Sequence, residues 1–181
     1  MNGPPPRPGE WVLLSYRVPR EPSAPRIAVW RKLKRLGVAQ LGDGLVALPC
    51  DARTREQLEW IAEEVTEAGG TAGLWLARPA TQAQERALAA AMAQARAQEY
   101  AAVREEALAA LALTGAARAG AVRRLRGELR RIMRRDYFPP AERDQARAAV
   151  EDLTRPSAAP ALPQTDTAVA DTGAAAIEEP S

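Results

Sequence analysis

The chain has 181 residues, a formal net charge of +2, no histidine and a single cysteine, Cys50. Without histidine there is no histidine general base and no His/Cys zinc site, and one cysteine cannot form an intrachain disulfide. No apolar run approaches the ~18 residues of a membrane span, and the N-terminus lacks a signal-peptide core. We therefore expect a cytoplasmic protein that is not an enzyme, uses no cofactor or metal and does not bind membranes.

Both ends of the chain are rich in Pro, Ala, Ser and Thr and poor in large apolar side chains. Such segments bury too little surface to offset the entropy lost on ordering, so residues 1–10 and 154–181 are predicted to be disordered. The rest is long enough for one compact domain, predicted over residues 11–79, and a helical extension over residues 80–153.

The compact domain is predicted to open with a strand and a basic helix. Apolar side chains alternate from Trp11 to Val18, and Pro19 ends the strand. Ser23 is predicted to cap the helix, and Gly37 is expected to end it. The apolar side of this helix is expected to comprise Val29, Trp30, Leu33 and Leu36.

The next elements are predicted to be a hairpin, a second helix and a last strand. Apolar runs at 38–41 and 45–48 flank Gly42-Asp43-Gly44, a turn sequence typical of hairpins. Thr54 and Gln57 form a predicted capping box for the helix, and residues 71–77 form the strand. The helix stripe is Leu58, Ile61, Ala62 and Val65. The order β-α-β-β-α-β predicts an α+β fold of the ferredoxin-like type.

The extension is predicted to be entirely helical. Thr81 and Gln84 form another predicted capping box, at the start of a helix that reaches about Leu113. Gly115 and Gly120 are expected to break the helical structure after that point. The apolar stripe of that helix is Leu88, Met92, Val103 and Leu111. A further helix has the stripe Val122, Leu125, Leu129, Ile132 and Met133, and a short helix over residues 141–153 carries Ala146, Val150 and Leu153.

Positive charge gathers in two stretches, residues 17–35 and 118–135. The second stretch has many arginines, whose planar guanidinium suits phosphate and other oxyanions, although a solvated helix face is the alternative. The candidate DNA- or oxyanion-binding residues are Arg17, Arg20, Arg26, Arg31, Lys32, Lys34, Arg35, Arg123, Arg124, Arg130, Arg131 and Arg134.

Three other groups are interpreted as structural rather than functional. Trp30, Trp60 and Trp75 are predicted to be core residues rather than platforms for stacked bases. The acidic residues between 56 and 67 are interpreted as a solvated helix face. Cys50 is interpreted as a partly buried structural residue rather than a redox-active thiol.

Several strings resemble the N-terminal domain of ChrB, the chromate-resistance regulator. They are Tyr16-Arg17-Val18-Pro19-Arg20-Glu21-Pro22-Ser23, Arg26, Trp30-Arg31-Lys32-Leu33-Lys34-Arg35-Leu36-Gly37, Thr54-Arg55-Glu56-Gln57, Trp60, Glu63-Glu64, Ala68-Gly69-Gly70 and Arg134-Arg135-Asp136-Tyr137-Phe138-Pro139. The resemblance covers about Trp11 to Leu153. It implies a transcriptional regulator that responds to chromate and to sulfate, with the basic residues between Arg17 and Arg35 as its site.

Three functional hypotheses stay open. The first is a dimeric regulator that binds the operator of a resistance operon through basic helices. The second is a module that binds a small oxyanion, chromate or sulfate, near Arg17, Arg20 and Arg26. The third is a protein-interaction module without DNA binding. Full-length ChrB continues into a second domain that this sequence does not match, so an autonomous response to chromate is an open question.

Overall fold

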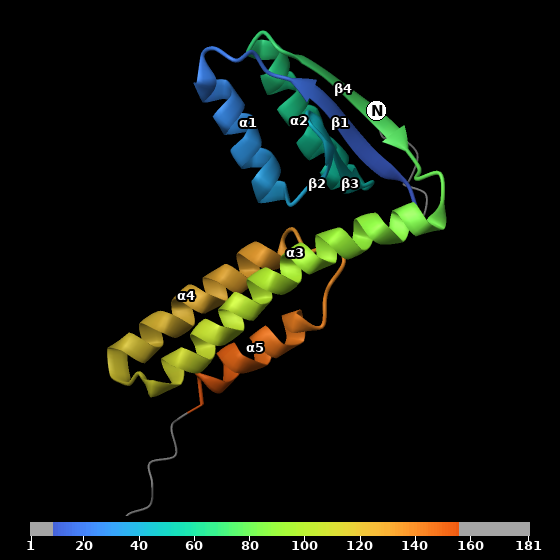
Figure 1. Ribbon diagram of the computed structural model, residues 1–181. Helices are drawn as coiled ribbons and strands as arrows, with labels where there is room; N and C mark the ends of the chain where they lie inside the picture. The colour runs from blue at the N-terminus through green and yellow to red at the C-terminus, as the bar shows by residue number, and fades with distance from the viewer. Residues whose placement is uncertain (1–8, 156–181) are drawn as a thin grey trace, which may run out of the picture.

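The computed structural model describes residues 9–155, and the predictions of disorder at 1–10 and 154–181 lie almost wholly outside this range. Strands and helices alternate first, and helices alone follow (Figure 1). The elements are β1 (Trp11–Arg17), α1 (Ser23–Leu36), β2 (Ala39–Gly42), β3 (Leu45–Pro49), α2 (Ala52–Glu67), β4 (Thr71–Ala77), α3 (Gln82–Ala109), a 3-10 turn (Ala110–Ala112), α4 (Gly115–Met133) and α5 (Glu142–Asp152).

The four strands form one antiparallel sheet in the order β2-β3-β1-β4. Val12 and Leu14 of β1 pair with Leu48 and Val46 of β3, so these four side chains share one face, and all of them are buried. Helices α1 and α2 cover that face (Figure 1) and add Val29, Leu33, Leu58, Ile61 and Val65 to its core. The predicted mixed α+β architecture is thereby confirmed.

Within residues 9–155, the opposite face of the sheet is covered only at one end. There Trp11 is buried and stacks on Phe138, with ring centroids 5.9 Å apart, and Leu88 of α3 packs nearby. A hollow of about 550 Å³ lies beside this contact and is lined by Leu13, Ala47 and the first turns of α3. Trp75, which pairs with Leu13, remains open to solvent on the same face.

The helices after the sheet form a bundle in which α4 and α5 flank the second half of α3 (Figure 1). Its core is made of small and medium apolar side chains around Tyr100, and the predicted residues Val103, Leu125, Leu129, Ile132, Ala146, Val150 and Leu153 are all buried there. Because α3 also contributes Met92 to the sheet's core, this one helix belongs to both cores.

Two helix starts differ from the prediction. Helix α2 begins at Ala52 rather than after Thr54, because Asp51 is the N-cap: its carboxylate accepts from the Thr54 N–H at 2.6 Å, and Thr54 Oγ1 accepts from the Asp51 N–H at 2.9 Å. Ser23 is the first helical residue of α1, since Pro22 occupies the N-cap position and no side chain caps the helix. Thr81 caps α3 as predicted.

The prediction that Trp30, Trp60 and Trp75 are core residues is wrong. Their exposed fractions are 53%, 59% and 61%, whereas Trp11 is buried. Each of the three is adjacent in sequence to the inward-facing position of its element, so a step of about 100° along a helix, or one residue along a strand, turns it outward. Leu111 and Met133 are likewise exposed rather than part of their stripes.

Gly120 does not interrupt the helical extension, because it lies inside α4, which begins at Gly115. A helical glycine costs about 1 kcal/mol relative to alanine, which the packing of neighbouring Ala121 and Leu125 offsets. No helix within residues 9–155 combines the length and the apolar character needed to cross a membrane.

Candidate functional site

Helix α4 has one buried side and one arginine-rich side. Ala121, Leu125, Leu129 and Ile132 face α3 and α5 and are buried, because they recur at the three- and four-residue spacing of a single helix face. The opposite side therefore points to solvent. Its arginines divide into two groups that differ in their partners.

The first group is an outward row made of Arg123, Arg126, Arg130 and Arg134, all exposed. Their spacing of three or four residues aligns them along about 16 Å of helix, at 1.5 Å per residue. Among the described residues, no hydrogen bond or ion pair engages any of these four guanidinium groups. The outward row thus presents positive charge that neighbouring side chains do not neutralise.

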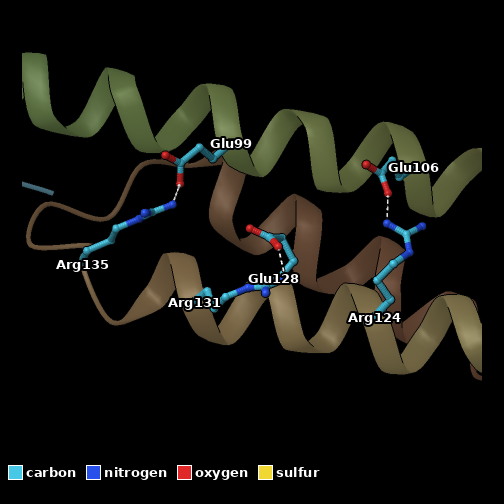
Figure 2. Close-up of polar contacts among 6 residues, drawn as sticks. All are labelled: Glu99, Glu106, Arg124, Glu128, Arg131 and Arg135. Carbon is cyan, nitrogen blue, oxygen red and sulfur yellow. Dashed lines mark hydrogen bonds and ion pairs between the residues drawn. The ribbon is translucent and has the colours of Figure 1, made fainter. Parts of the chain in front are cut away.

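The second group consists of arginines paired with carboxylates (Figure 2). Arg124 on α4 pairs with Glu106 on α3, and Arg131 pairs with Glu128 one turn earlier on its own helix. Arg135, just beyond α4, donates to Glu99 at 2.7 Å and completes a triad with Arg96. The pairs that reach α3 hold α4 against it, and the charge of the whole group is largely matched within the molecule.

The basic residues of α1 lie on the outer surface of the helix layer. Arg26, Arg31, Lys34 and Arg35 are exposed, and the Lys34 ammonium lies 4.9 Å from the centre of the Trp30 ring. Lys32 differs from them, because it is half-buried and forms an ion pair with Glu64 of α2. Of the predicted α1 residues, Lys32 is thus the one that joins the two helices.

Arg17 and Arg20 line a separate hollow of about 480 Å³ with Gly69, Gly70 and Thr71. Gly70 is needed for this close approach, because a β-carbon there would lie 2.4 Å from the carbonyl oxygen of Arg17. Arg26 does not line the hollow, so the structure brings together two of the three residues predicted to cradle an oxyanion.

The turn Asp136-Tyr137-Phe138 fastens the sheet unit to the helix bundle. The Tyr137 hydroxyl donates to the carbonyl of Leu36 at 3.2 Å, at the end of α1, while Phe138 stacks on Trp11. Asp136, whose side chain is 1% exposed, accepts from the Tyr100 hydroxyl. Burial raises the pKa of both Tyr100 and Tyr137 above the usual 10.0.

Cys50 follows β3 and is half-buried, as predicted. Burial and the nearby carboxylate of Glu10 raise the pKa of its thiol, so the reactive thiolate is disfavoured. No cluster of three Asp, Glu or Cys side chains in residues 9–155 is placed to hold a metal ion.

The sequence-based set of candidate residues omitted Arg126, which belongs to the outward row, and included Arg124 and Arg131, whose charge is matched internally. The helical spacing could have identified Arg126, because this residue stands three positions from Arg123 and three positions from Leu129. The pairing with Glu106 joins separate helices, so only the fold reveals it.

The fold and these surfaces define a mixed α+β protein in which a sheet unit is fastened to a bundle that displays arginines. Residues 26–109 match the family model described as Protein ChrB, N-terminal. The match spans slightly less than half of the chain, from α1 to the end of α3, and supports an association with chromate resistance. Neither a curated protein nor a solved structure matches the chain.

Proposed function

We propose that this protein is a transcriptional regulator of chromate-resistance genes that binds DNA through the outward row of α4. The unpaired arginines of that row carry the proposal. Phosphate contacts provide most of the affinity of proteins for DNA, and guanidinium groups bind phosphate through paired hydrogen bonds. Along a duplex, a row about 16 Å long reaches several phosphates of one strand, which follow one another at about 3.4 Å of rise.

The basic side of α1 is a weaker candidate for the DNA contact. Helix α2 lies beside it, and Glu63 and Glu67 of α2 are exposed on the same layer. A duplex laid along α1 brings its phosphates toward those carboxylates, which opposes binding. Helix α4, in contrast, has its nearby carboxylates, Glu106 and Glu128, already paired with arginines.

The test is a DNA-binding titration with the sequence upstream of the protein's own operon, over a series of salt concentrations and with or without chromate. Arg126→Ala/Arg130→Ala removes two members of the outward row. We expect it to weaken binding and to lower the slope of log K against log [salt] by about 0.9 for each phosphate that is no longer neutralised. Release of the DNA by chromate would assign sensing to this chain.

Arg124→Ala/Arg131→Ala is the matched control, because it removes the same charge from the same helix at internally paired positions. It is expected to change the salt slope little. Equal reductions in the two double variants would mean that only net charge matters. No binding at low salt would contradict the proposal and favour a protein-interaction module.

A second candidate function is the binding of a small oxyanion in the hollow lined by Arg17 and Arg20. Two arginines that line one hollow suit a tetrahedral dianion such as chromate or sulfate. Thermal melting with either anion tests this: stabilisation that Arg20→Ala abolishes and Arg31→Ala retains supports it. Arg31 is the control because it is exposed on α1, away from the hollow lining. No shift at millimolar anion rejects it.

We also propose that residues 11–79 constitute a ferredoxin-like domain. The β-α-β-β-α-β order and the packing of both helices on one face of an antiparallel sheet support this assignment. The boundary with the extension at residues 79 and 80 falls between β4 and α3, although Met92 of α3 lies in the sheet's core.

A further inference from the structure

The outer surface of the α1–α2 layer combines two exposed tryptophans with opposite charges. On α1, the basic face consists of Ile27, Trp30, Arg31, Lys34 and Arg35. On α2, the acidic face consists of Glu56, Trp60, Glu63 and Glu67, which recur at helical spacing. Each face therefore has a large aromatic side chain flanked by charge of a single sign.

These charges are not matched within the described part of the molecule. The ion pair between Lys32 and Glu64 joins α1 to α2 along their shared edge, and Arg55 pairs with Glu59 near the start of α2. Within residues 9–155, no ion pair includes Arg31, Arg35, Glu56, Glu63 or Glu67. The two helices lie side by side on one face of the sheet (Figure 1), so their outer faces form one continuous surface.

We propose that this surface is the interface of a homodimer in which the basic face of each copy packs on the acidic face of the other. A two-fold axis that lies in the plane of the interface, along the helices and between α1 and α2, sets α1 over α2 of the partner and α2 over its α1 at once. Cations then meet carboxylates on both halves, while Trp30 and Trp60 supply the apolar centre that stable interfaces require. The inference does not depend on the proposed DNA contact, because that contact lies on α4.

Self-association fits this surface better than a nucleic acid or a uniformly charged protein does. Any polyanion that gains from the basic face is repelled by the acidic face next to it, and a polycation meets the reverse problem. A second copy of the chain offers both signs in the matching order. The half-exposed tryptophans also favour a partner, since each leaves a large apolar area in water in the monomer.

Charge reversal tests the proposal without requiring the exact residue pairs to be known. The acidic variant, Arg31→Glu/Arg35→Glu, makes both faces negative; the basic variant, Glu63→Arg/Glu67→Arg, makes both positive. We expect sedimentation velocity to show a dimer for the wild type, with a dissociation constant raised at least about tenfold in each variant alone. An equimolar mixture of the two variants is expected to form a heterodimer more readily than either variant forms a homodimer, because opposite charges then face one another.

The control is Arg104→Glu/Arg147→Glu, which changes net charge as much as the acidic variant but alters exposed positions of α3 and α5. It is expected to dimerise like the wild type. Trp30→Ala is expected to weaken the dimer, whereas Trp75→Ala, on the other face of the sheet, is not. Far-UV circular dichroism verifies that each variant is folded, which is expected because all the altered side chains are exposed.

Three outcomes overturn the proposal. The first is a wild-type protein that stays monomeric at concentrations of about 100 μM, where even weak specific dimers assemble. The second is a mixture of the two variants that remains monomeric. The third is an acidic variant that keeps its dimer but loses affinity for DNA, which would assign the basic face to nucleic acid instead.

Discussion

The hydroxyl of Tyr100 donates a 2.9 Å hydrogen bond to Oδ2 of Asp136 and thereby joins the middle of α3 to the turn that follows α4. Both side chains are buried, and the carboxylate also has the guanidinium of Arg143 4.0 Å away. This hydrogen bond lies where the bundle meets the sheet unit. Its removal should therefore lower the free energy of unfolding of the whole molecule.

Tyr100→Phe is expected to lower the free energy of unfolding by about 1.5–3 kcal/mol, because it removes a hydrogen bond to a buried carboxylate while leaving the ring in place. Tyr137→Phe is the control. It removes a 3.2 Å bond to a neutral carbonyl, that of Leu36, and should cost only about 1 kcal/mol. Urea denaturation measures both. Equal destabilisation by the two variants would show that the charge of Asp136 does not strengthen the hydrogen bond from Tyr100.

Alkaline pH is expected to destabilise the protein through its tyrosines. Burial raises the pKa of Tyr16, Tyr100 and Tyr137 above the usual 10.0, so the folded state favours the neutral phenol. Their contribution to stability is complete below the unfolded pKa of 10.0 and is lost as the pH rises toward the higher folded values. Urea midpoints should therefore fall as the pH rises from ~10 to ~12, less steeply in Tyr100→Phe. A midpoint independent of pH in this window would contradict the prediction.

Thr54→Val is expected to destabilise the protein by about 2 kcal/mol, because it removes one half of the capping box at the start of α2. The fully buried Thr54 hydroxyl also donates to the carbonyl of Pro49 at 2.7 Å, which would be left without that donor. Ser23→Ala on α1 should change stability by less than about 0.5 kcal/mol, since Ser23 caps nothing. A similar effect at both positions, measured by thermal or urea unfolding, would refute this assignment of the caps.

Tryptophan fluorescence should report mostly exposed indoles. Trp30, Trp60 and Trp75 are more than half exposed, whereas Trp11 is 3% exposed. Acrylamide is expected to quench most of the emission at low protein concentration and to leave a protected fraction that disappears in Trp11→Phe. At high concentration, protection of Trp30 and Trp60 would accompany the proposed dimer. A protected fraction that survives Trp11→Phe at low concentration would contradict the burial pattern.

The order of the elements in the sheet unit, and their limits apart from the starts of α1 and α2, could be predicted from the sequence, because local signals determine them. Gly42-Asp43-Gly44 forms the hairpin turn, Gly37 ends α1 with a positive φ of 69°, and residues 71–77 form the last strand. The N-cap of α2 was misplaced by three residues, since Asp51 and Thr54 are both good capping residues. Only the observed bonds show which of them occupies the cap.

The orientation of large side chains could not be predicted reliably, and it determines the candidate surfaces. Periodicity places Val29 and Leu33 inward, but it leaves neighbouring Trp30 near the border of the apolar face, where hydrophobicity alone favours burial. Likewise, which arginines remain without an ion-pair partner depends on carboxylates such as Glu106, which lies 18 residues from Arg124. Such partners come together only through the packing of α4 on α3.

Because α3 continues unbroken from the sheet's core into the core of the bundle, the chain cannot be divided cleanly at the end of its family match. A fragment ending at Ala109 would keep the whole of α3 but lack α4 and α5, leaving Tyr100, Val103 and Ala107 facing water. It would also lack Phe138, and with it the cover over Trp11. Such a fragment should be prone to aggregation, and a shorter one ending before Tyr100 would be the better choice for isolating the sheet unit.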